Sequence, residues 1–467
     1  MRQPAHGLQA IIQKNEHWLH RLFLVAFFGL SCLHIYTGYA DNGDFWRSTS
    51  FLIDKPVGFL SNWPESETAE WKRRFFFEWH DRWVFASEWF QSGFFSLSFY
   101  KLYLLMQAGV SMLLSGDSTQ YSVILGSLPS RVLVFASFVA LAAWIRARHG
   151  ALAGWGFALP AAAVLLDSGW MAFLNSFYEE QIAVVLLPVL ALLMLRFLER
   201  RTVRSACLLL ACAALMGATK TAYFYLPLLV FLFIFPWLHK PRGWVFAAMC
   251  AGQFLAFAPV ALGKYAGINA YHSVYFGALK VLPPQERAAM QSLGRKPVLQ
   301  ECIGISAFEP SGPACLQDAH VRHGDFVSLL VRNPSIVYSM LGVALQEGRH
   351  AIDGLGKGMR NAPQFAQLGI FNLLPPLFMR GFNVFVLGLL AALACVAIVR
   401  ACLGKSLEPL LMAGIFLALF GWSQYAMALG DGFFEIRKHL VIGNYALALA
   451  FPFMAAACVA MAKRRKC

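Results

Sequence analysis

The sequence predicts an all-α polytopic membrane protein with about ten transmembrane helices. Hydrophobic residues make up 58% of the 467 residues and charged residues only 14%. Many apolar runs approach the roughly 20 residues that cross a bilayer, and basic residues cluster at the ends of these runs. Because this clustering is the positive-inside pattern of membrane proteins, we expect no nucleic-acid partner despite the net charge of +14.

The basic clusters also predict which ends of the spans face the cytoplasm. They lie at Arg2/Lys14/Arg21, Arg146/Arg148, Arg200/Arg201/Arg204, Lys240/Arg242, Arg400/Lys405 and residues 463–466. Placing all of them inside makes both termini cytoplasmic and predicts spans near 22–39, 131–146, 154–173, 182–198, 205–219, 222–238, 243–263, 381–400, 407–428 and 440–461. The chain then divides into an N-terminal transmembrane module over 1–263, an external cap over 264–380 and C-terminal transmembrane helices over 381–467.

The external segment 40–130 interleaves aromatic rings with charges. Trp71 and Phe75 enclose three basic residues, and a histidine and two charged residues separate Trp79 from Trp83. This pattern predicts amphipathic helices along the bilayer surface, with rings at headgroup depth and long basic side chains reaching outward. An aromatic belt that only anchors the protein explains most of the same residues.

Two of the ten cysteines, Cys302 and Cys315, fall in a predicted external segment. The others lie in apolar spans or beside cytoplasmic ends. Since external compartments are oxidising and the loop between the two contains Gly and Pro, the sequence predicts a disulfide.

An acidic motif directly follows the first predicted span. Asp41 and Asp44 stand three apart around Gly43, which lets the backbone bend tightly. Such a pair at the membrane surface could act as a general base or bind a metal ion. An ordinary Asx/Gly turn that ends a helix accounts for the same spacing.

A second group surrounds the fourth and fifth spans. Tyr178, Glu179 and Glu180 begin the fourth span, where capping of a helix N-terminus would explain one of the two acids. Lys220 lies between two apolar helices, where a lone ammonium is costly and a phosphate is a natural partner. A lysine that reaches to lipid headgroups is the alternative.

The segment between the last two spans is dense in ionisable groups. It holds Asp431, Glu435, Arg437, Lys438 and His439, and cations beside acids predict a phosphate-binding site held by its own counter-charges. The histidines lack zinc-ligand spacing. The chain has no P-loop, dinucleotide fingerprint or nucleophile elbow, which argues against ATP-driven transport and soluble-type hydrolase chemistry.

Together these motifs resemble the GT-C superfamily of integral-membrane glycosyltransferases, and more narrowly the bacterial hexosyltransferases of surface-glycan assembly. The acidic motif, the aromatic first loop and the large late external segment carry the likeness over most of the chain. The sequence departs from the adjacent acid pair common in that superfamily, since Asp41 and Asp44 are three apart. Which acid is the base therefore stays open.

The resemblance implies inverting transfer of a hexosyl or pentosyl group from a polyprenyl-phosphate donor, such as an undecaprenyl-phosphate sugar, to a glycan, lipid or protein acceptor. The reaction would take place at the periplasmic face of a bacterial inner membrane. Asp44, with Asp41 as second choice, would take the acceptor proton. The donor phosphate would bind Lys220, Arg437, Lys438 and His439. The groups that would orient acceptor or sugar, or hold a divalent cation such as Mg or Mn, are Tyr178, Glu179, Glu180, Asp431 and Glu435.

Two other functions fit parts of the sequence. A lipid-linked oligosaccharide polymerase or ligase would share the basic cluster, but we would expect its catalytic residues mainly in the late external loop. A secondary transporter would suit ten spans with charges in the membrane, but transporters usually have matched halves and charges at the bilayer midplane.

Overall fold

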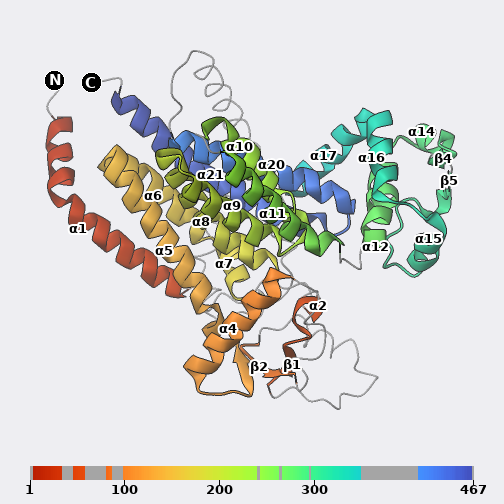
Figure 1. The fold of residues 1–467 in the computed structure, drawn as a ribbon, viewed down its shortest axis with the longest axis horizontal. Coiled ribbons are helices and arrows are strands. Elements are labelled where there is room, and N and C mark those ends of the chain that lie inside the picture. The colour runs from red at the N-terminus through yellow and green to blue at the C-terminus, as the bar shows by residue number, and fades with distance from the viewer. Residues whose placement is uncertain are drawn as a thin grey trace.

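The computed structural model describes residues 4–33, 46–57, 80–86, 98–238, 242–261, 266–293, 296–348 and 409–464 (Figure 1). This part is mostly helical, with one sheet of three short strands and one of two. The predicted helical class is therefore confirmed. Several features predicted from the sequence lie outside the described residues, among them Asp41 and Asp44, the stretches 58–79 and 87–97 of the aromatic loop, residues 349–380 of the cap and the span at 381–400.

A bundle of helices forms the larger part of the molecule (Figure 1). Its members are α1 (Pro4–Leu33), α5 (Val123–His149), α6 (Ala151–Leu165), α7 (Ser168–Leu174), α8 (Glu180–Arg200), α9 (Val203–Gly217), α10 (Leu226–Ile234), α11 (Arg242–Ala261), α20 (Pro409–Ala428) and α21 (Ile436–Arg464). Helix α21 packs against α20, α6 and α8. A Cβ on Gly421 would lie 2.9 Å from the carbonyl oxygen of Gly443, so this glycine pair lets α20 and α21 approach closely.

Four helices within the described ranges are long and apolar enough to cross a membrane: Val123–His149, Glu180–Arg200, Pro409–Asp431 and Ile436–Met461. A fifth would be the pair His323–Arg332 and Pro334–Gly348, which is bent by 108°, if the pair counts as one span. Four apolar helices are shorter: Trp18–Cys32, Ala151–Leu165, Val203–Gly217 and Thr221–Trp237. These helices are compatible with a multi-pass membrane protein, and the count of about ten spans stays a prediction.

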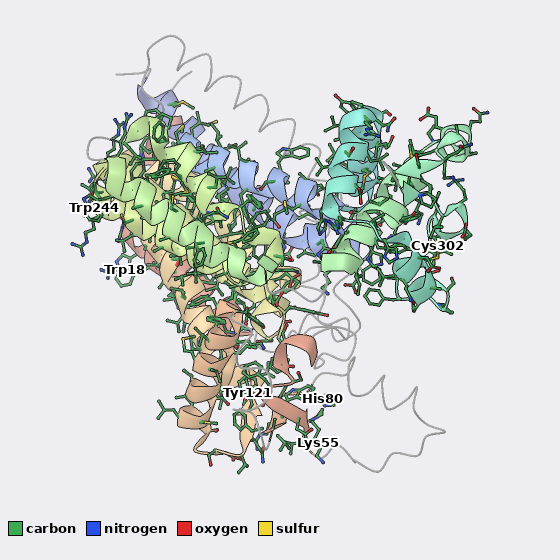
Figure 2. The ribbon with its side chains drawn as sticks, turned by 45° about the vertical axis from the view of Figure 1, so that its right-hand side comes forward. Trp18, Lys55, His80, Tyr121, Trp244 and Cys302 are labelled. Carbon is green, nitrogen blue, oxygen red and sulfur yellow. A yellow bond between two sulfur atoms is a disulfide. The ribbon has the colours of Figure 1, made fainter. Side chains whose placement is uncertain are left out.

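Large apolar side chains project from the outside of the bundle. Trp18 is 74% exposed and Trp244 is 72% exposed, and both lie on its outer face in Figure 2. Phe254 of α11 is more exposed still, at 84%. Exposed apolar surface on this scale is typical of contact with lipid.

Two predicted spans are not continuous helices. The predicted span 154–173 breaks between α6 and α7, because the Asp167 carboxylate accepts a hydrogen bond from the Gly169 amide at 2.8 Å and caps α7. The predicted span 222–238 contains the 3-10 turns η3 (Thr221–Tyr223) and η4 (Phe235–Trp237) on either side of α10. Pro227 and Pro236 lack the amide hydrogen that a regular helix needs. Hydropathy therefore located the apolar segments but did not predict where the helices within them are interrupted.

A small unit of sheet and helix precedes α5. It comprises α2 (Trp46–Thr49), β1 (Ile53–Pro56), β2 (Arg82–Phe85), α4 (Phe99–Ser115) and β3 (Gln120–Ser122). The strands pair antiparallel in the order β1-β2-β3. Trp83, Tyr100, Leu104 and Tyr121 form its core. For segment 40–130 the sequence predicted only surface-lying helices, so these strands are a correction.

Helix α5 starts at Val123 rather than at the predicted residue 131. The Asp81 carboxylate accepts hydrogen bonds at 3.0 Å from the Ile124 amide and from the Ser122 hydroxyl. An acid at this position satisfies amide groups of the first helical turn and favours its dipole. The polar contacts therefore extend the helix beyond the apolar run.

The segment 266–348 forms a group of short elements beside the bundle (Figure 1). They are α12 (Ala266–Tyr271), the π-helix η5 (His272–Ala278), α13 (Leu279–Val281), α14 (Pro284–Ala289), β4 (Ser292–Leu293), β5 (Lys296–Pro297), η6 (Gln300–Cys302), α15 (Gly312–Ala319), α16 (His323–Arg332) and α17 (Pro334–Gly348). Cys302 and Cys315 form a disulfide with a Cα–Cα distance of 5.6 Å. The predicted bond is confirmed.

The bundle has two chemically different ends. Both termini and the turns after α5 and α8 lie at one end, which we call the basic end for Arg146, Arg148, Arg200, Arg201 and Arg204 (Figure 1). The loops before α8, after α9 and before α21 lie at the other end, which we call the site end.

Candidate functional site

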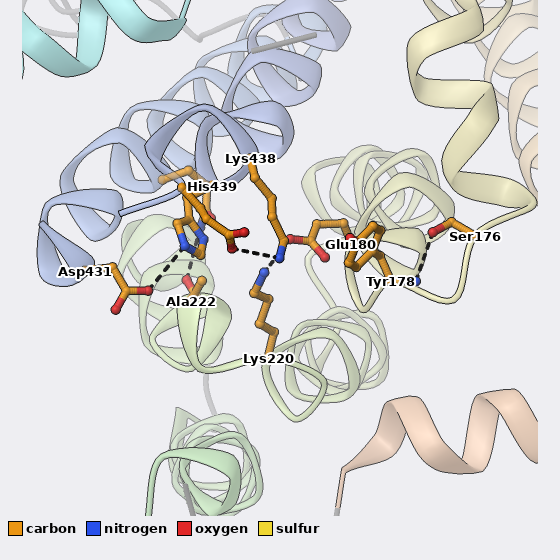
Figure 3. Close-up of polar contacts among 10 residues, drawn as sticks. Ser176, Tyr178, Glu180, Lys220, Ala222, Asp431, Lys438 and His439 are labelled. Carbon is orange, nitrogen blue, oxygen red and sulfur yellow. Dashed lines mark hydrogen bonds and ion pairs between the residues drawn. The ribbon is translucent and has the colours of Figure 1, made fainter. Parts of the chain in front are cut away.

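Three of the four polar motifs predicted from the sequence meet at the site end (Figure 3). Glu180 begins α8, Lys220 follows α9, and Lys438 lies in the first turn of α21. The side chains of these residues are 3%, 10% and 6% exposed. The fourth motif, with Asp41 and Asp44, lies outside the described residues.

Lys220 and Glu180 form an ion pair. The α8–α9 hairpin brings them together, because Lys220 stands three residues after the end of α9 and Glu180 is the first residue of α8. Glu180 also lies within electrostatic range of Lys438. One buried carboxylate thus faces the buried ammonium of Lys438 and the largely covered ammonium of Lys220.

Lys438 makes two further contacts. Its ammonium donates to the Glu435 carboxylate at 3.1 Å and lies 4.9 Å from the centre of the Tyr178 ring. We call Glu180, Lys220, Glu435 and Lys438 the inner cluster. Its formal charges balance, and Tyr178 adds an aromatic wall that favours a cation.

The remaining charges of the last loop point elsewhere. Arg437 donates to Glu347 of α17 at 2.5 Å, and His439 pairs with Asp431 at 3.3 Å. Consecutive residues of a helix point about 100° apart, and Arg437, Lys438 and His439 accordingly contact three different acids, Glu347, Glu435 and Asp431. The predicted cation cluster is therefore divided, and only Lys438 belongs to the inner cluster.

Backbone geometry holds the last loop in place. Gly432 has a φ of +61°, and a Cβ on it would lie 2.2 Å from the carbonyl oxygen of His272. Only glycine fits this close approach. The loop that carries Asp431 and Glu435 is thereby packed against η5.

The loop that carries the acid pair is held by an aromatic anchor. Phe177 is buried, and its ring lies 5.7 Å from the ring of Trp83 and 5.6 Å from that of Tyr121. The Ser176 hydroxyl accepts a hydrogen bond from the Tyr178 amide at 3.0 Å. The small sheet unit therefore positions Tyr178 and the two glutamates.

Glu179 is half-buried and makes no side-chain capping bond to α8. Helix capping was one explanation of the acid pair from sequence, and the structure does not support it for Glu179. Tyr100 and Tyr223 lie within electrostatic range of both acids. Burial, followed by the negative charge of Glu179, raises the pKa of Tyr100 well above its usual value, so this phenol stays protonated.

Sequence reasoning missed Arg131, a buried guanidinium on α5. It donates to the Asn175 side chain at 2.6 Å and to the carbonyl oxygen of Ser31 at 3.3 Å. It therefore ties the loop of the acid pair to the end of α1. An arginine inside an apolar stretch, eight residues beyond the true start of its helix, was the available signal.

Within the described ranges, no group of three or more His, Cys, Asp and Glu side chains could hold a metal ion. The divalent cation suggested by the sequence stays a prediction. The acids of the inner cluster are instead matched by lysines.

The site end thus offers two ammonium groups that are at most 10% exposed, two carboxylates and an aromatic wall beside exposed apolar helices. Such a set can bind an anion that carries an apolar chain, and it can neutralise charge that develops on that anion. No protein-family model and no curated protein matches the sequence.

Proposed function

We propose that the chain is a GT-C-type membrane glycosyltransferase that moves a sugar from a polyprenyl-phosphate donor to an acceptor in the cell envelope. One observation carries this proposal: Lys220 and Lys438 converge on Glu180 from opposite halves of the chain, and their side chains are only 10% and 6% exposed. Ammonium groups removed from water need anions beside them; Glu180 and Glu435 supply these in the structure, and the donor phosphate would join them at the same two lysines.

A donor phosphate fits the inner cluster. Lys220 donates to Glu180 and Lys438 donates to Glu435. Because an ammonium has three N–H donors, a lysine that contacts a carboxylate can also donate to a phosphate oxygen. Neutralising the phosphate makes it a better leaving group, so the reaction needs no general acid.

The other predicted residues would act outside the inner cluster. Arg437 and His439 would attract the donor from the rim of the site, while Glu179 and Asp431 would orient acceptor hydroxyls. Asp44, or Asp41, would take the proton from the acceptor as it attacks the anomeric carbon from the face opposite the phosphate. That geometry inverts the configuration. About ten spans, with the site end at the periplasmic face, complete the proposal.

The test uses purified wild-type protein and a panel of undecaprenyl-phosphate sugars, with membrane extract as the acceptor source. Wild type is expected to release undecaprenyl phosphate, and Asp44→Asn to release none. Lys438→Gln is expected to lower kcat/KM by about 100-fold, which corresponds to about 2.7 kcal/mol of transition-state stabilisation.

The matched control is Arg148→Gln, which removes one positive charge at the basic end, where Arg148 pairs with Glu199. It is expected to keep wild-type turnover. If folded wild-type protein turns over no sugar on the panel but moves a solute across proteoliposomes, the glycosyltransferase proposal fails and a transporter replaces it.

A further inference from the structure

A cavity of about 230 Å³ opens between α8 and α9 at the basic end, away from the inner cluster. Leu193 and Leu208 form its apolar wall. Arg196, Arg200 and Arg204 line it together with the hydroxyl-bearing Thr202 and Ser205.

The turn between the helices creates this arrangement. Helix α8 ends at Arg200, Arg201 takes a left-handed φ of +50°, and the Thr202 hydroxyl accepts a hydrogen bond from the Ser205 amide at 3.2 Å to start α9. Arg196 and Arg200 stand one helical turn apart on α8. The short turn brings Arg204, in the first turn of α9, beside them.

These three guanidinium groups differ from their neighbours at the same end. Arg148 is paired with Glu199, Arg146 is 3.0 Å from Glu16, and Arg201 lies 5.3 Å from the centre of the Trp237 ring. Across the described part of the chain, by contrast, no carboxylate pairs with any of the three arginines that line the cavity.

Three like charges around one cavity repel each other, and the positive end of the α9 dipole adds to them. An anion removes this repulsion. Guanidinium groups match phosphate oxygens in geometry and bind them through paired N–H donors. The apolar wall adds a second requirement, since Leu208 is 50% exposed and would face acyl chains in a bilayer.

We propose that this cavity binds the phosphate headgroup of an anionic phospholipid, with Leu193 and Leu208 contacting its acyl chains. The lipid would neutralise Arg196, Arg200 and Arg204 and fix the α8–α9 turn at the membrane surface. This site is separate from the inner cluster and does not depend on the proposed reaction.

The experiment is native mass spectrometry of the full chain in detergent, titrated with phosphatidylglycerol or with phosphatidylcholine of the same acyl chains. We expect tighter binding of phosphatidylglycerol by wild type. The triple variant Arg196→Gln/Arg200→Gln/Arg204→Gln is expected to weaken that binding by about tenfold or more. Arg148→Gln and Arg201→Gln change the same charge at neighbouring positions and are expected to leave binding within about twofold.

Two outcomes would overturn the proposal. In one, the triple variant binds phosphatidylglycerol as tightly as wild type does. The variant's unfolding temperature without lipid, equal to that of wild type, shows that it is folded. In the other, inorganic phosphate displaces the phosphatidylglycerol at comparable concentration, which would make the cavity a site for the free anion. Retention of the lipid against excess inorganic phosphate supports the assigned acyl contacts.

Discussion

Lys220 and Glu180 are 40 residues apart in the chain, yet their side chains form an ion pair in the interior of the site end. Removing one member of a buried pair leaves the other charge without compensation. That loss typically costs about 3–5 kcal/mol, whereas replacing both members with neutral groups costs much less. The pair therefore predicts a non-additive response to mutation.

We expect Lys220→Met to lower the free energy of unfolding by about 3 kcal/mol, because Glu180 stays buried without its main partner. Glu180→Gln/Lys220→Met is expected to recover more than half of this loss. Unfolding in detergent of wild type, both single variants and the double variant measures the coupling. Additive single losses would show that the two residues do not act as a pair.

Phe177→Ala is expected to lower stability by about 3–4 kcal/mol, since it empties the contact with Trp83 and Tyr121. The loop of the acid pair should also loosen and expose Lys220. Acylation of Lys220 by an amine-reactive reagent, read by peptide mass spectrometry, should become faster in folded protein. The control is Phe254→Ala, because the Phe254 side chain is 84% exposed. Unchanged Lys220 reactivity would argue against the anchoring role.

Much of the helical fold was predictable because long apolar helices can be recognised in a sequence by their length and composition. The strands β1, β2 and β3 were not, because three or four residues are too few to show alternation. The early start of α5 was also hidden, since it depends on Asp81, 42 residues before Val123 in the sequence. The pattern of residues around Val123 cannot predict a hydrogen bond to a residue so far away in the sequence.

The individual charged residues of the site were predictable from the sequence, but which of them contact one another was not. Glu180, Lys220 and Lys438 each stood out because a charge at the end of an apolar span is costly. Their meeting depends on the register of the α8–α9 hairpin against α21, which no single segment encodes. The sequence grouped Arg437 with Lys438, and the helix points them to different partners. The disulfide was predictable because compartment and cysteine count limited the choice.

His272 predicts a pH dependence of stability. Its Nε2 accepts a hydrogen bond from the Ala307 amide at 3.0 Å, which requires a neutral ring, and burial lowers its pKa to about 4 from the usual 6.5. Because the unfolded state binds the proton more tightly, this stabilisation is complete above pH 6.5. It is lost as the pH falls toward 4, by about 3 kcal/mol in all.

Thermal unfolding of wild type and of His272→Gln between pH 4 and 7.5 tests this expectation. The wild-type melting temperature should fall with acidification in that window, and the variant should show a shallower slope. Equal slopes for the two proteins would place the acid sensitivity in other groups.

Reduction of the Cys302–Cys315 disulfide is expected to destabilise the segment 296–320 before the bundle. The bond closes a loop with a sequence separation of 13, for which chain entropy gives about 3 kcal/mol. Protease cleavage within the loop should rise after reduction, while cleavage between α8 and α9 stays constant. Cys302→Ser/Cys315→Ser should behave like the reduced protein. If the loop resists cleavage equally in both redox states, the bond does not hold the segment.

Tyr178 and Lys438 predict a coupling that separates the aromatic wall from the ion pairs. The ring centre lies 4.9 Å from the ammonium, and a desolvated contact of this kind contributes about 2 kcal/mol. Tyr178→Phe keeps the ring and should leave stability nearly unchanged. Tyr178→Leu should lower it by about 2 kcal/mol in protein that has Lys438, and by much less in Lys438→Met. If the leucine change costs the same with and without Lys438, the ring acts only by filling space and does not stabilise the ammonium.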